Sequence, residues 1–277
     1  MTGDALLTAD SDHRFSPAQL LVSIRNATEA NAALHAGVDW IDLKEPNHGS
    51  LGLPTLETAA AVATLLCDAG ARSRSSVALG ELCEVMPKAD EVIAAYSRRF
   101  PVAKVGLAEA SPGWRENLDQ LRSLVTPCQL VPVHYADFKE CKGVPLPEIF
   151  DWMNRSAPVQ ANRRDNDVSE SLDGCVPRVL IDTKLKDGRT LLDFYSVDEL
   201  IKWCSDAASL GIRLLLAGSL NAAAVLQLRR TGAEAVGVRG AVCQGERNSS
   251  LCELQLRNLV EQFNSKKDVF EPQTAHR

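Results

Sequence analysis

Lysine and aspartate side chains lie close together in three apolar segments of this chain. Asp42 and Lys44 stand in Trp-Ile-Asp-Leu-Lys, Lys104 in Val-Ala-Lys-Val-Gly, and Asp182 and Lys186 in Ile-Asp-Thr-Lys-Leu-Lys. Burial and neighbouring cations both lower the pKa of a lysine, and the neutral amine that results attacks carbonyl carbons. Carboxylates beside it hold the other ammonium groups and transfer protons. The residue types therefore predict imine chemistry, with ordinary buried ion pairs or solvated lysines at strand ends as the plain alternative.

Short β-branched runs alternate with longer stretches of helical periodicity along the chain. Because each helix returns the chain to the same end of the sheet, this alternation predicts parallel strands. Eight such units predict a single (β/α)8 TIM barrel, and 277 residues suit that fold. A doubly wound open sheet is the alternative, but the first turn from strand to helix lacks a Gly-x-Gly-x-x-Gly pattern. The predicted strands are Leu20–Ile24, Trp40–Leu43, Ser76–Leu79, Val102–Val105, Gln129–Val133, Val179–Asp182, Leu214–Ala217 and Ala235–Val238.

Helices are predicted between these strands, and glycines mark several of their ends. Gly37, Gly70, Gly211 and Gly232 each follow a periodic apolar stretch and precede a strand, where a helix C-cap belongs. The predicted helices are Ala27–His35, Leu56–Ala69, Asp90–Arg99, Trp114–Leu124, Val197–Ser209, Ala222–Arg230 and a last one at Leu254–Phe263.

The alternation of side chains within each strand predicts which of them enter the barrel. In the second strand, Ile41 and Leu43 face the helices, whereas Asp42 and Lys44 face the barrel axis. Active sites of such barrels lie at the C-terminal ends of the strands, and alternate strands share layers of side chains, so the charged groups should converge there. The same alternation turns inward Lys104 of the fourth strand and Leu180, Asp182 and Lys184 of the sixth, with Lys186 just beyond.

Small residues after the seventh and eighth strands predict a phosphate site. The turns are Ala217-Gly218-Ser219-Leu220 and Gly237-Val238-Arg239-Gly240-Ala241, whose backbone N–H groups can approach a phosphate closely. Arg239 would add a bidentate contact. Lys139, after the fifth strand, is a candidate for a second phosphate. Glycine-rich turns that bind no phosphate are the alternative.

No cofactor or metal site is indicated by the remaining polar residues. His, Asp and Glu do not cluster at ligand spacing, and the eight cysteines are scattered without a Cys-x-x-Cys pair, as expected of reduced thiols. His48, in the loop Glu45–Gly52 that follows Lys44, is either an acid–base group or an exposed bystander.

Composition and charge exclude several classes of protein. A net charge of −6 and a pI near 5.5 argue against a nucleic-acid binder. No apolar run is long enough to span a membrane, and the first residues lack the order of a secretory signal. We therefore expect a cytoplasmic protein that binds small molecules. Its oligomeric state stays open, and a homo-oligomer is compatible with the sequence.

Polar segments flank and interrupt the predicted barrel. Residues 1–17 and 266–277 are expected to be tails around a catalytic domain of residues 18–265. Residues 157–177 are charge-mixed and without periodicity, which is typical of a flexible loop. This insertion precedes the sixth strand, and that position puts it at the barrel end opposite the lysines.

Four phrases of the chain together resemble the (5-formylfuran-3-yl)methyl phosphate synthase family. They are LLVSIRNATEANAALHAGVDWIDLKEPNHGSLG, AKVGL, LIDTKLKDGRTLLDF and LAGSL. The resemblance runs from about Leu20 to Phe263, and IDLKEPxxGSLG and IDTxxKDG are its more specific parts. Lys184 departs from the pattern, because a small residue is expected there.

The resemblance implies a lyase of the class I aldolase type that joins two glyceraldehyde 3-phosphate molecules for methanofuran biosynthesis. It implies that Lys44 forms the Schiff base and that Lys104, Lys186, Asp42 and Asp182 accompany it. No cofactor is implied, because the overall reaction is redox-neutral. Three alternatives stay open: another imine-forming aldolase, an isomerase of a sugar phosphate, and a barrel that binds phosphates without catalysis.

Overall fold

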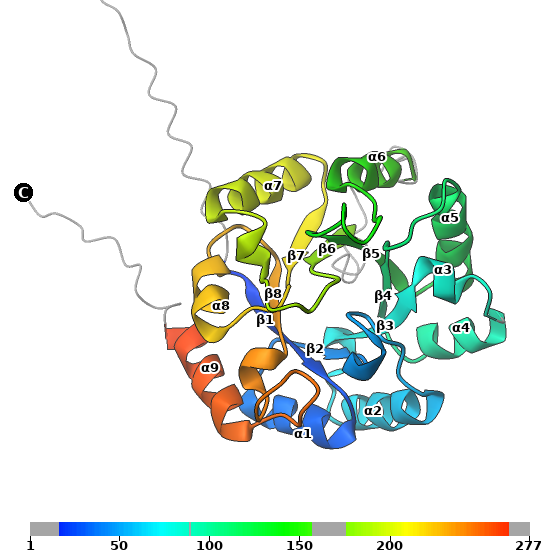
Figure 1. Ribbon diagram of the computed structural model, residues 1–277. Helices are drawn as coiled ribbons and strands as arrows, with labels where there is room; N and C mark the ends of the chain where they lie inside the picture. The colour runs from blue at the N-terminus through cyan, green and yellow to red at the C-terminus, as the bar shows by residue number, and fades with distance from the viewer. Residues whose placement is uncertain (1–16, 89, 157–175, 266–277) are drawn as a thin grey trace, which may run out of the picture.

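The strands of this protein form a closed parallel barrel. The computed structural model describes residues 17–88, 90–156 and 176–265, and in these residues eight strands pair in chain order, with β8 closing on β1 (Figure 1). The predicted (β/α)8 barrel is confirmed. The strands are β1 (Gln19–Ile24), β2 (Trp40–Leu43), β3 (Ser75–Glu81), β4 (Val102–Gly106), β5 (Gln129–Tyr135), β6 (Arg178–Asp182), β7 (Arg213–Leu216) and β8 (Ala235–Val238).

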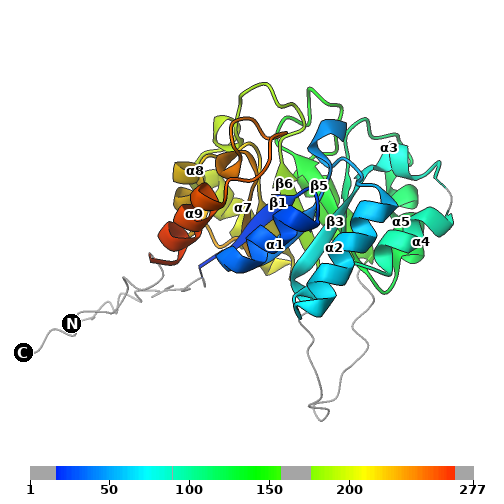
Figure 2. The same ribbon diagram turned by 90° about the horizontal axis from the view of Figure 1, so that it is seen from below.

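Helices surround the barrel and cover its outer face (Figures 1 and 2). They include two that the sequence analysis did not single out, α3 and α6. Among the described residues there are also four short 3-10 turns, of which η1 (Pro46–His48) and η5 (Gly240–Val242) follow β2 and β8. The helices in the described ranges are α1 (Ala27–Ala36), α2 (Leu56–Asp68), α3 (Leu82–Val85), α4 (Asp90–Ser97), α5 (Trp114–Val125), α6 (Leu146–Ser156), α7 (Val197–Ser209), α8 (Ala222–Leu228) and α9 (Glu253–Ser265).

Local signals in the sequence explain where these helices begin and end. The Asn26 side chain accepts a hydrogen bond from the Glu29 N–H at 2.9 Å and caps the start of α1. Gly37 ends that helix with φ at 76°, a left-handed conformation that glycine adopts without steric cost. Ser196 and Glu199 form a capping box at the start of α7.

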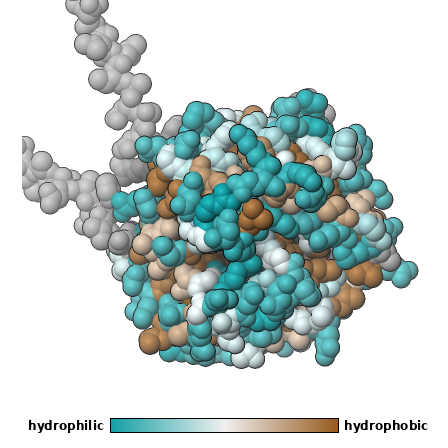
Figure 3. Space-filling view, in the orientation of Figure 1, coloured by the Kyte–Doolittle hydropathy of each residue, from teal (hydrophilic) through white to brown (hydrophobic). Residues whose placement is uncertain are grey.

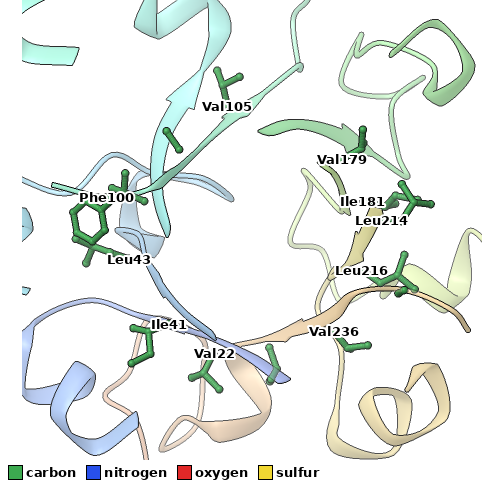
Figure 4. Packing of buried hydrophobic residues seen from close by; sticks show 14 of the residues in the cluster. Val22, Ile41, Leu43, Phe100, Val105, Val179, Ile181, Leu214, Leu216 and Val236 are labelled. Atoms are coloured by element: carbon green, nitrogen blue, oxygen red, sulfur yellow. The ribbon is translucent and has the colours of Figure 1, made fainter. Parts of the chain in front are cut away.

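The outward face of the strands builds the main apolar core. Ile41 and Leu43 of β2 point away from the barrel axis and pack against the helices, as the alternation predicts (Figure 4). Val22, Val105 and Ile181 do the same on their strands and are fully buried. This layer between sheet and helices fixes the direction of the alternate side chains, which must therefore enter the barrel.

The inside of the barrel has an apolar floor. Leu21, Val102, Val131, Leu180 and Leu215 form a second buried cluster there. Two residues further along β1, β4 and β6, the inward positions carry polar side chains, namely Ser23, Lys104 and Asp182. Charged groups therefore occupy one layer at the C-terminal end of the barrel, above a floor that excludes water.

Three expectations concern segments that lie wholly or mostly outside the described residues. These are the tails at 1–17 and 266–277 and the insertion at 157–177. None of the helices in the described ranges combines the length and apolar character that crossing a bilayer requires.

Helix α9 covers the seam where the first and last strands meet, and it offers a test of the fold. It packs against α1 and α8, with Phe263 fully buried at its inner face. We expect Phe263→Ala to lower the free energy of unfolding by about 3–5 kcal/mol, because the cavity left behind cannot collapse completely. Urea denaturation would measure the loss, with Gln262→Ala on the exposed face of the same helix as control. Equal midpoints for the two variants would contradict a structural role for α9.

Candidate active site

Two ion pairs, one buried and one partly buried, stand on opposite sides of the polar layer. The Lys104 Nζ atom lies 2.7 Å from Asp42 Oδ1, with side chains only 3% and 2% exposed. Lys186 Nζ lies 3.1 Å from Asp182 Oδ1, and it also donates to the Thr183 carbonyl at 2.6 Å. Each pair combines an aspartate at a strand end with a lysine, so both charges are balanced at close range.

Serine hydroxyls hold both aspartates in place. Ser23 and Ser76 donate to the two oxygens of Asp42 at 3.0 and 2.7 Å. Ser50, in the loop after β2, donates to Asp182 Oδ2 at 3.2 Å and bonds the Thr183 carbonyl at 2.9 Å. Sequence reasoning missed these serines. The alternation that turned Asp42 inward applies equally to Ser23 and Ser76, whereas nothing in the sequence predicts the position of Ser50.

Lys44 lies between the two pairs and differs from both of their lysines. Its side chain is buried, and its ammonium makes no hydrogen bond or ion pair within the described ranges. Burial is the largest cause that lowers the pKa of Lys44, and Asp182 and Asp42 oppose it while the charges of Lys186 and Lys104 add to it. Together these effects bring the pKa to about 8. A substantial fraction of this amine is therefore neutral near physiological pH.

The aspartate beside Lys44 stays ionised. Burial by itself raises the pKa of Asp182, but the charges of Lys186 and Lys44 and the hydrogen bond from the Thr183 N–H outweigh it and bring the pKa to about 2. Burial also lowers the pKa of Lys186, with Asp182 opposing that shift. The site thus holds a fixed carboxylate next to an amine that changes its charge near neutral pH.

A cavity of about 380 Å³ opens above these groups. Hydrophilic residues gather over the middle of the same face of the molecule (Figure 3). The five side chains predicted to carry the chemistry all line this cavity, together with the turns after β7 and β8. They are Asp42, Lys44, Lys104, Asp182 and Lys186.

The turn after β7 has an unusual backbone. Gly218 has φ at 120°, and a Cβ there would come within 3.1 Å of Thr183 Cγ2, so only glycine fits. Ser219 follows with φ at 52° and is exposed to the cavity. Neither N–H of these two residues donates to another residue in the described parts of the chain. With Gly240, which also lines the cavity, they leave donors free for an anion.

Arg239 borders the cavity but is engaged by the protein itself. Its guanidinium bonds both oxygens of Glu29, at 2.9 and 3.3 Å, and three carbonyl groups. Because a guanidinium has five N–H donors, none is left for a phosphate. The expectation that Arg239 binds phosphate is therefore corrected: the residue joins β8 to α1 and to its own loop.

Arg247, which sequence reasoning missed, has guanidinium N–H donors that the described parts of the chain do not use. It lies in the loop after η5, lines the cavity, and makes one side-chain hydrogen bond in the described ranges, from Nη2 to the Gly49 carbonyl at 3.2 Å. Burial lowers its pKa, as does the charge of Arg239, while Asp182 opposes the shift. A half-buried cation with unused donors therefore lines the cavity, with its Cβ next to Gly240 of the turn after β8.

The other candidates lie away from the cavity. Lys139 is exposed, with its ammonium 5.9 Å from the centre of the Phe138 ring, so the structure removes it from the predicted phosphate site. His48 is also exposed and does not line the cavity. In the described ranges, no cluster of His, Cys, Asp and Glu could hold a metal ion. Lys184 turns to the opposite wall and pairs with Glu81.

Comparison of the fold with solved structures finds other (β/α)8 enzymes at low sequence identity. Phosphoribosyl anthranilate isomerase from Thermotoga maritima superposes with a TM-score of 0.58 at 11% identity, covering 90% of this chain and 99% of that one. 3-Hexulose-6-phosphate synthase from Salmonella typhimurium gives 0.54 at 11% identity, covering 89% and 99%. These likenesses establish the fold alone.

Comparison of the sequence identifies closer relatives. The (5-formylfuran-3-yl)methyl phosphate synthase of Methanopyrus kandleri is 30% identical over 269 residues, which cover 88% of this chain and 98% of the relative. That of Methanocaldococcus jannaschii is 29% identical over 248 residues, covering 86% and 95%. The sequence profile of 4-HFC-P synthase matches residues 20–260, which contain all of the barrel strands except Gln19, the first residue of β1. The chain belongs to the 4-HFC-P synthase family.

Proposed function

We propose that this protein condenses two molecules of glyceraldehyde 3-phosphate into (5-formylfuran-3-yl)methyl phosphate, a precursor of methanofuran, through an imine on Lys44. Family membership supports a synthase of this kind. The observation that carries the mechanism is the buried Lys44 amine, which stands without a hydrogen-bond partner in the described ranges between two ion-paired lysines. An amine in that position is a nucleophile toward an aldehyde.

The overall reaction balances without an oxidant or a reductant. Two triose phosphates lose one phosphate and two waters and become one furan aldehyde phosphate. The Lys44 amine adds to the aldehyde carbon of one triose, and loss of water leaves an imine. Its positive nitrogen accepts electron density when a proton leaves the neighbouring carbon, and that carbon then attacks the second aldehyde. Elimination of phosphate and ring closure with loss of two waters follow. The water released on imine formation is returned when the imine is hydrolysed, which frees the Lys44 amine and the product.

The surrounding groups match the proton transfers that this sequence needs. Asp182 is ionised and lies beside Lys44, so it is our candidate base for the carbon next to the imine. Lys104 and Lys186, each held by an aspartate, are candidates to protonate the leaving oxygens. The apolar floor below them limits access of water from the barrel interior.

The phosphate groups require cations and N–H donors away from the reacting carbons. Gly218, Ser219 and Gly240 supply the donors, and Arg247 and Lys186 supply charge at the same side of the cavity. We therefore assign to Arg247 the contact that the sequence analysis gave to Arg239.

The covalent step is tested by reductive trapping. With glyceraldehyde 3-phosphate and borohydride, we expect a stable adduct on Lys44, found by mass spectrometry. Lys44→Ala should abolish the adduct and lower kcat by more than about a thousandfold, as expected when a covalent nucleophile is lost. The exposed Lys139→Ala is the matched control. An adduct that persists in Lys44→Ala, or that forms with other sugar phosphates but not with the triose, would contradict the proposal.

The pH dependence of trapping follows from the lowered pKa of Lys44. Only the neutral amine reacts, so the rate of adduct formation should rise about tenfold per pH unit below 8 and level off above it. Asp182→Asn should move the midpoint to lower pH, because Asp182 favours the charged form of Lys44. Cyanoborohydride trapping between pH 5 and about 10.5 measures both effects. A rate that still rises steeply above pH 9 would indicate an ordinary exposed lysine.

The phosphate contact is tested at Arg247. Loss of a charge-assisted hydrogen bond costs about 1.5–3 kcal/mol, so Arg247→Ala should raise KM for the triose phosphate by about 10–100-fold with a smaller change in kcat. Trapping of unphosphorylated glyceraldehyde should be unaffected. Arg257→Ala, an exposed arginine of α9, is the control. An unchanged KM would remove Arg247 from the site.

A further inference from the structure

The two aspartates of the site differ in the donors that hold their oxygens. Asp42 Oδ1 accepts from Ser76 and from Lys104, each at 2.7 Å, and Asp42 Oδ2 accepts from Ser23 at 3.0 Å. Within the described ranges, the side chains of these three donors have no second acceptor. Asp42 is therefore held by donors that have nowhere else to turn.

Asp182 has one oxygen that is fully engaged and one that is held by a single hydroxyl. Its Oδ1 atom accepts from the Thr183 N–H at 2.7 Å and from Lys186 Nζ at 3.1 Å. In the described parts of the chain, its Oδ2 atom accepts only from the Ser50 hydroxyl, at 3.2 Å. Oδ2 is therefore the oxygen of Asp182 that can take up a proton, and Ser50 is the group that must accommodate it.

The Ser50 hydroxyl has two acceptors but only one hydrogen. The main-chain carbonyl of Thr183 lies 2.9 Å from Ser50 Oγ, closer than the Asp182 carboxylate. This carbonyl also accepts from Lys186 at 2.6 Å, and its second lone pair is left for Ser50. Because Ser50 is only 1% exposed, water does not compete for its hydroxyl. Rotation about the Cβ–Oγ bond thus moves the hydrogen from one acceptor to the other and turns a lone pair of Oγ toward Asp182.

The loop after β2 holds the rest of Ser50 in place. The Glu45 N–H donates to the Gly52 carbonyl at 2.8 Å and closes this loop at its base. Arg247 donates to the Gly49 carbonyl at 3.2 Å from the loop after β8, and Gly49 has φ at 107°, which glycine adopts without steric cost. With the backbone fixed on both sides of Ser50, its hydroxyl hydrogen is the part that is free to turn.

A condition for proton transfer follows from the charge state of Asp182. Its pKa of about 2 makes it a weak base in the resting site. A proton taken from carbon must nevertheless stay on Oδ2 until the second aldehyde is attacked. A donor fixed at Oδ2, as the donors of Asp42 are fixed, would then meet a second hydrogen and lose its own bond. A hydroxyl that turns aside becomes an acceptor for that hydrogen instead.

We propose that Ser50 is a positioning residue that acts through Asp182, with its hydroxyl changing from donor to acceptor when Asp182 takes up the proton. We call this change the Ser50 switch. It rests on the proposed function, because it concerns the base of the same reaction. In the resting site the Ser50 hydroxyl donates to Asp182 Oδ2, and in the protonated state it donates to the Thr183 carbonyl while Asp182 donates to Ser50 Oγ.

The protons and electrons of this step balance. The C–H bond next to the imine carbon breaks, its electron pair passes toward the imine nitrogen, and the proton moves to Asp182 Oδ2. A carboxylate and a positive imine thereby become a neutral acid and a neutral enamine. Ser50 keeps its own proton throughout and only turns it toward the Thr183 carbonyl.

The test separates imine formation from removal of the carbon-bound proton. Reductive trapping of glyceraldehyde 3-phosphate on Lys44 measures the first step. Turnover of the triose deuterated at C2, compared with the ordinary triose and followed by the ultraviolet absorbance of the furan aldehyde, reports the second. Ser50→Ala removes one oxygen atom and should leave the trapping rate close to that of the parent. It should lower kcat by about 10–100-fold, because a hydrogen bond to a charged group is lost, with an isotope effect on kcat at least as large as that of the parent.

Three further variants complete the comparison. Ser50→Cys places a weak donor and acceptor at the same position and should show the same isotope-sensitive loss of kcat. Ser23→Ala removes a buried hydroxyl from Asp42, and its isotope effect should not exceed that of the parent. Ser123→Ala, at an exposed position of α5, is the surface control.

The outcomes distinguish the Ser50 switch from the imine mechanism. Equal losses of trapping and turnover in Ser50→Ala would indicate general damage to the site and would overturn the switch, as would a loss of kcat with a smaller isotope effect than that of the parent. A parent that traps and converts the triose, with Ser50→Ala equal to it, would overturn the switch alone. A parent that forms no adduct on Lys44 would overturn the imine mechanism and the switch with it.

Discussion

The electrostatic balance between two buried aspartates and three lysines is the constraint on which the site depends. An ammonium group removed from water is costly unless a carboxylate compensates it. Asp42 compensates Lys104 at 2.7 Å and Asp182 compensates Lys186 at 3.1 Å, and each pair is close to neutral. Lys44 lies within the electrostatic influence of both carboxylates, but in the described parts of the chain it forms an ion pair with neither. The lowered pKa of Lys44 therefore depends on the whole group. It requires the burial of Lys44, and it requires that Asp42 and Asp182 are already paired with Lys104 and Lys186, whose positive charges oppose the effect of the two aspartates on Lys44.

The fold produces this balance because the side chains of the strands are arranged in layers. The outward side chains of the strands pack under the helices, and the inward ones are apolar at the bottom and polar at the top. A strand end that is rigid on its outer face holds its last inward side chain at a fixed place, which a mobile loop would not do. The loops then add what the strands cannot reach. Ser50 comes from the loop after β2 and binds Asp182 on β6, so it connects the two sides of the site.

Much of this arrangement could be predicted from the sequence, for a physical reason that also explains the failures. The strict alternation in β2, β4 and β6 places Asp42, Lys104 and Asp182 inside, because these strands are regular. The bulge at Gly80 reverses the alternation in β3, so counting residues would have turned Glu81 outward. Arg239 was misassigned because its partner Glu29 lies 210 residues away, and Arg247 was missed because a loop has no periodicity to read.

The charges that are left unbalanced by these ion pairs indicate what kind of ligand the cavity would attract. Among the residues that line it, Lys44, Lys104, Lys186 and Arg247 face only Asp42 and Asp182, while Glu29 neutralises Arg239. The excess is two positive charges when Lys44 is protonated and one when it is neutral, in a protein whose net charge is −6. A local excess of this sign in an acidic protein attracts anions to one place on its surface.

A phosphate dianion at the β7 and β8 turns would neutralise this positive charge. Its charge would also favour the protonated form of Lys44, so a phosphate held close to that amine would oppose the reaction it is meant to serve. Separation of the proposed phosphate-binding turns from Lys44 is therefore a chemical requirement of this mechanism, and a barrel meets it by placing the two on different strands.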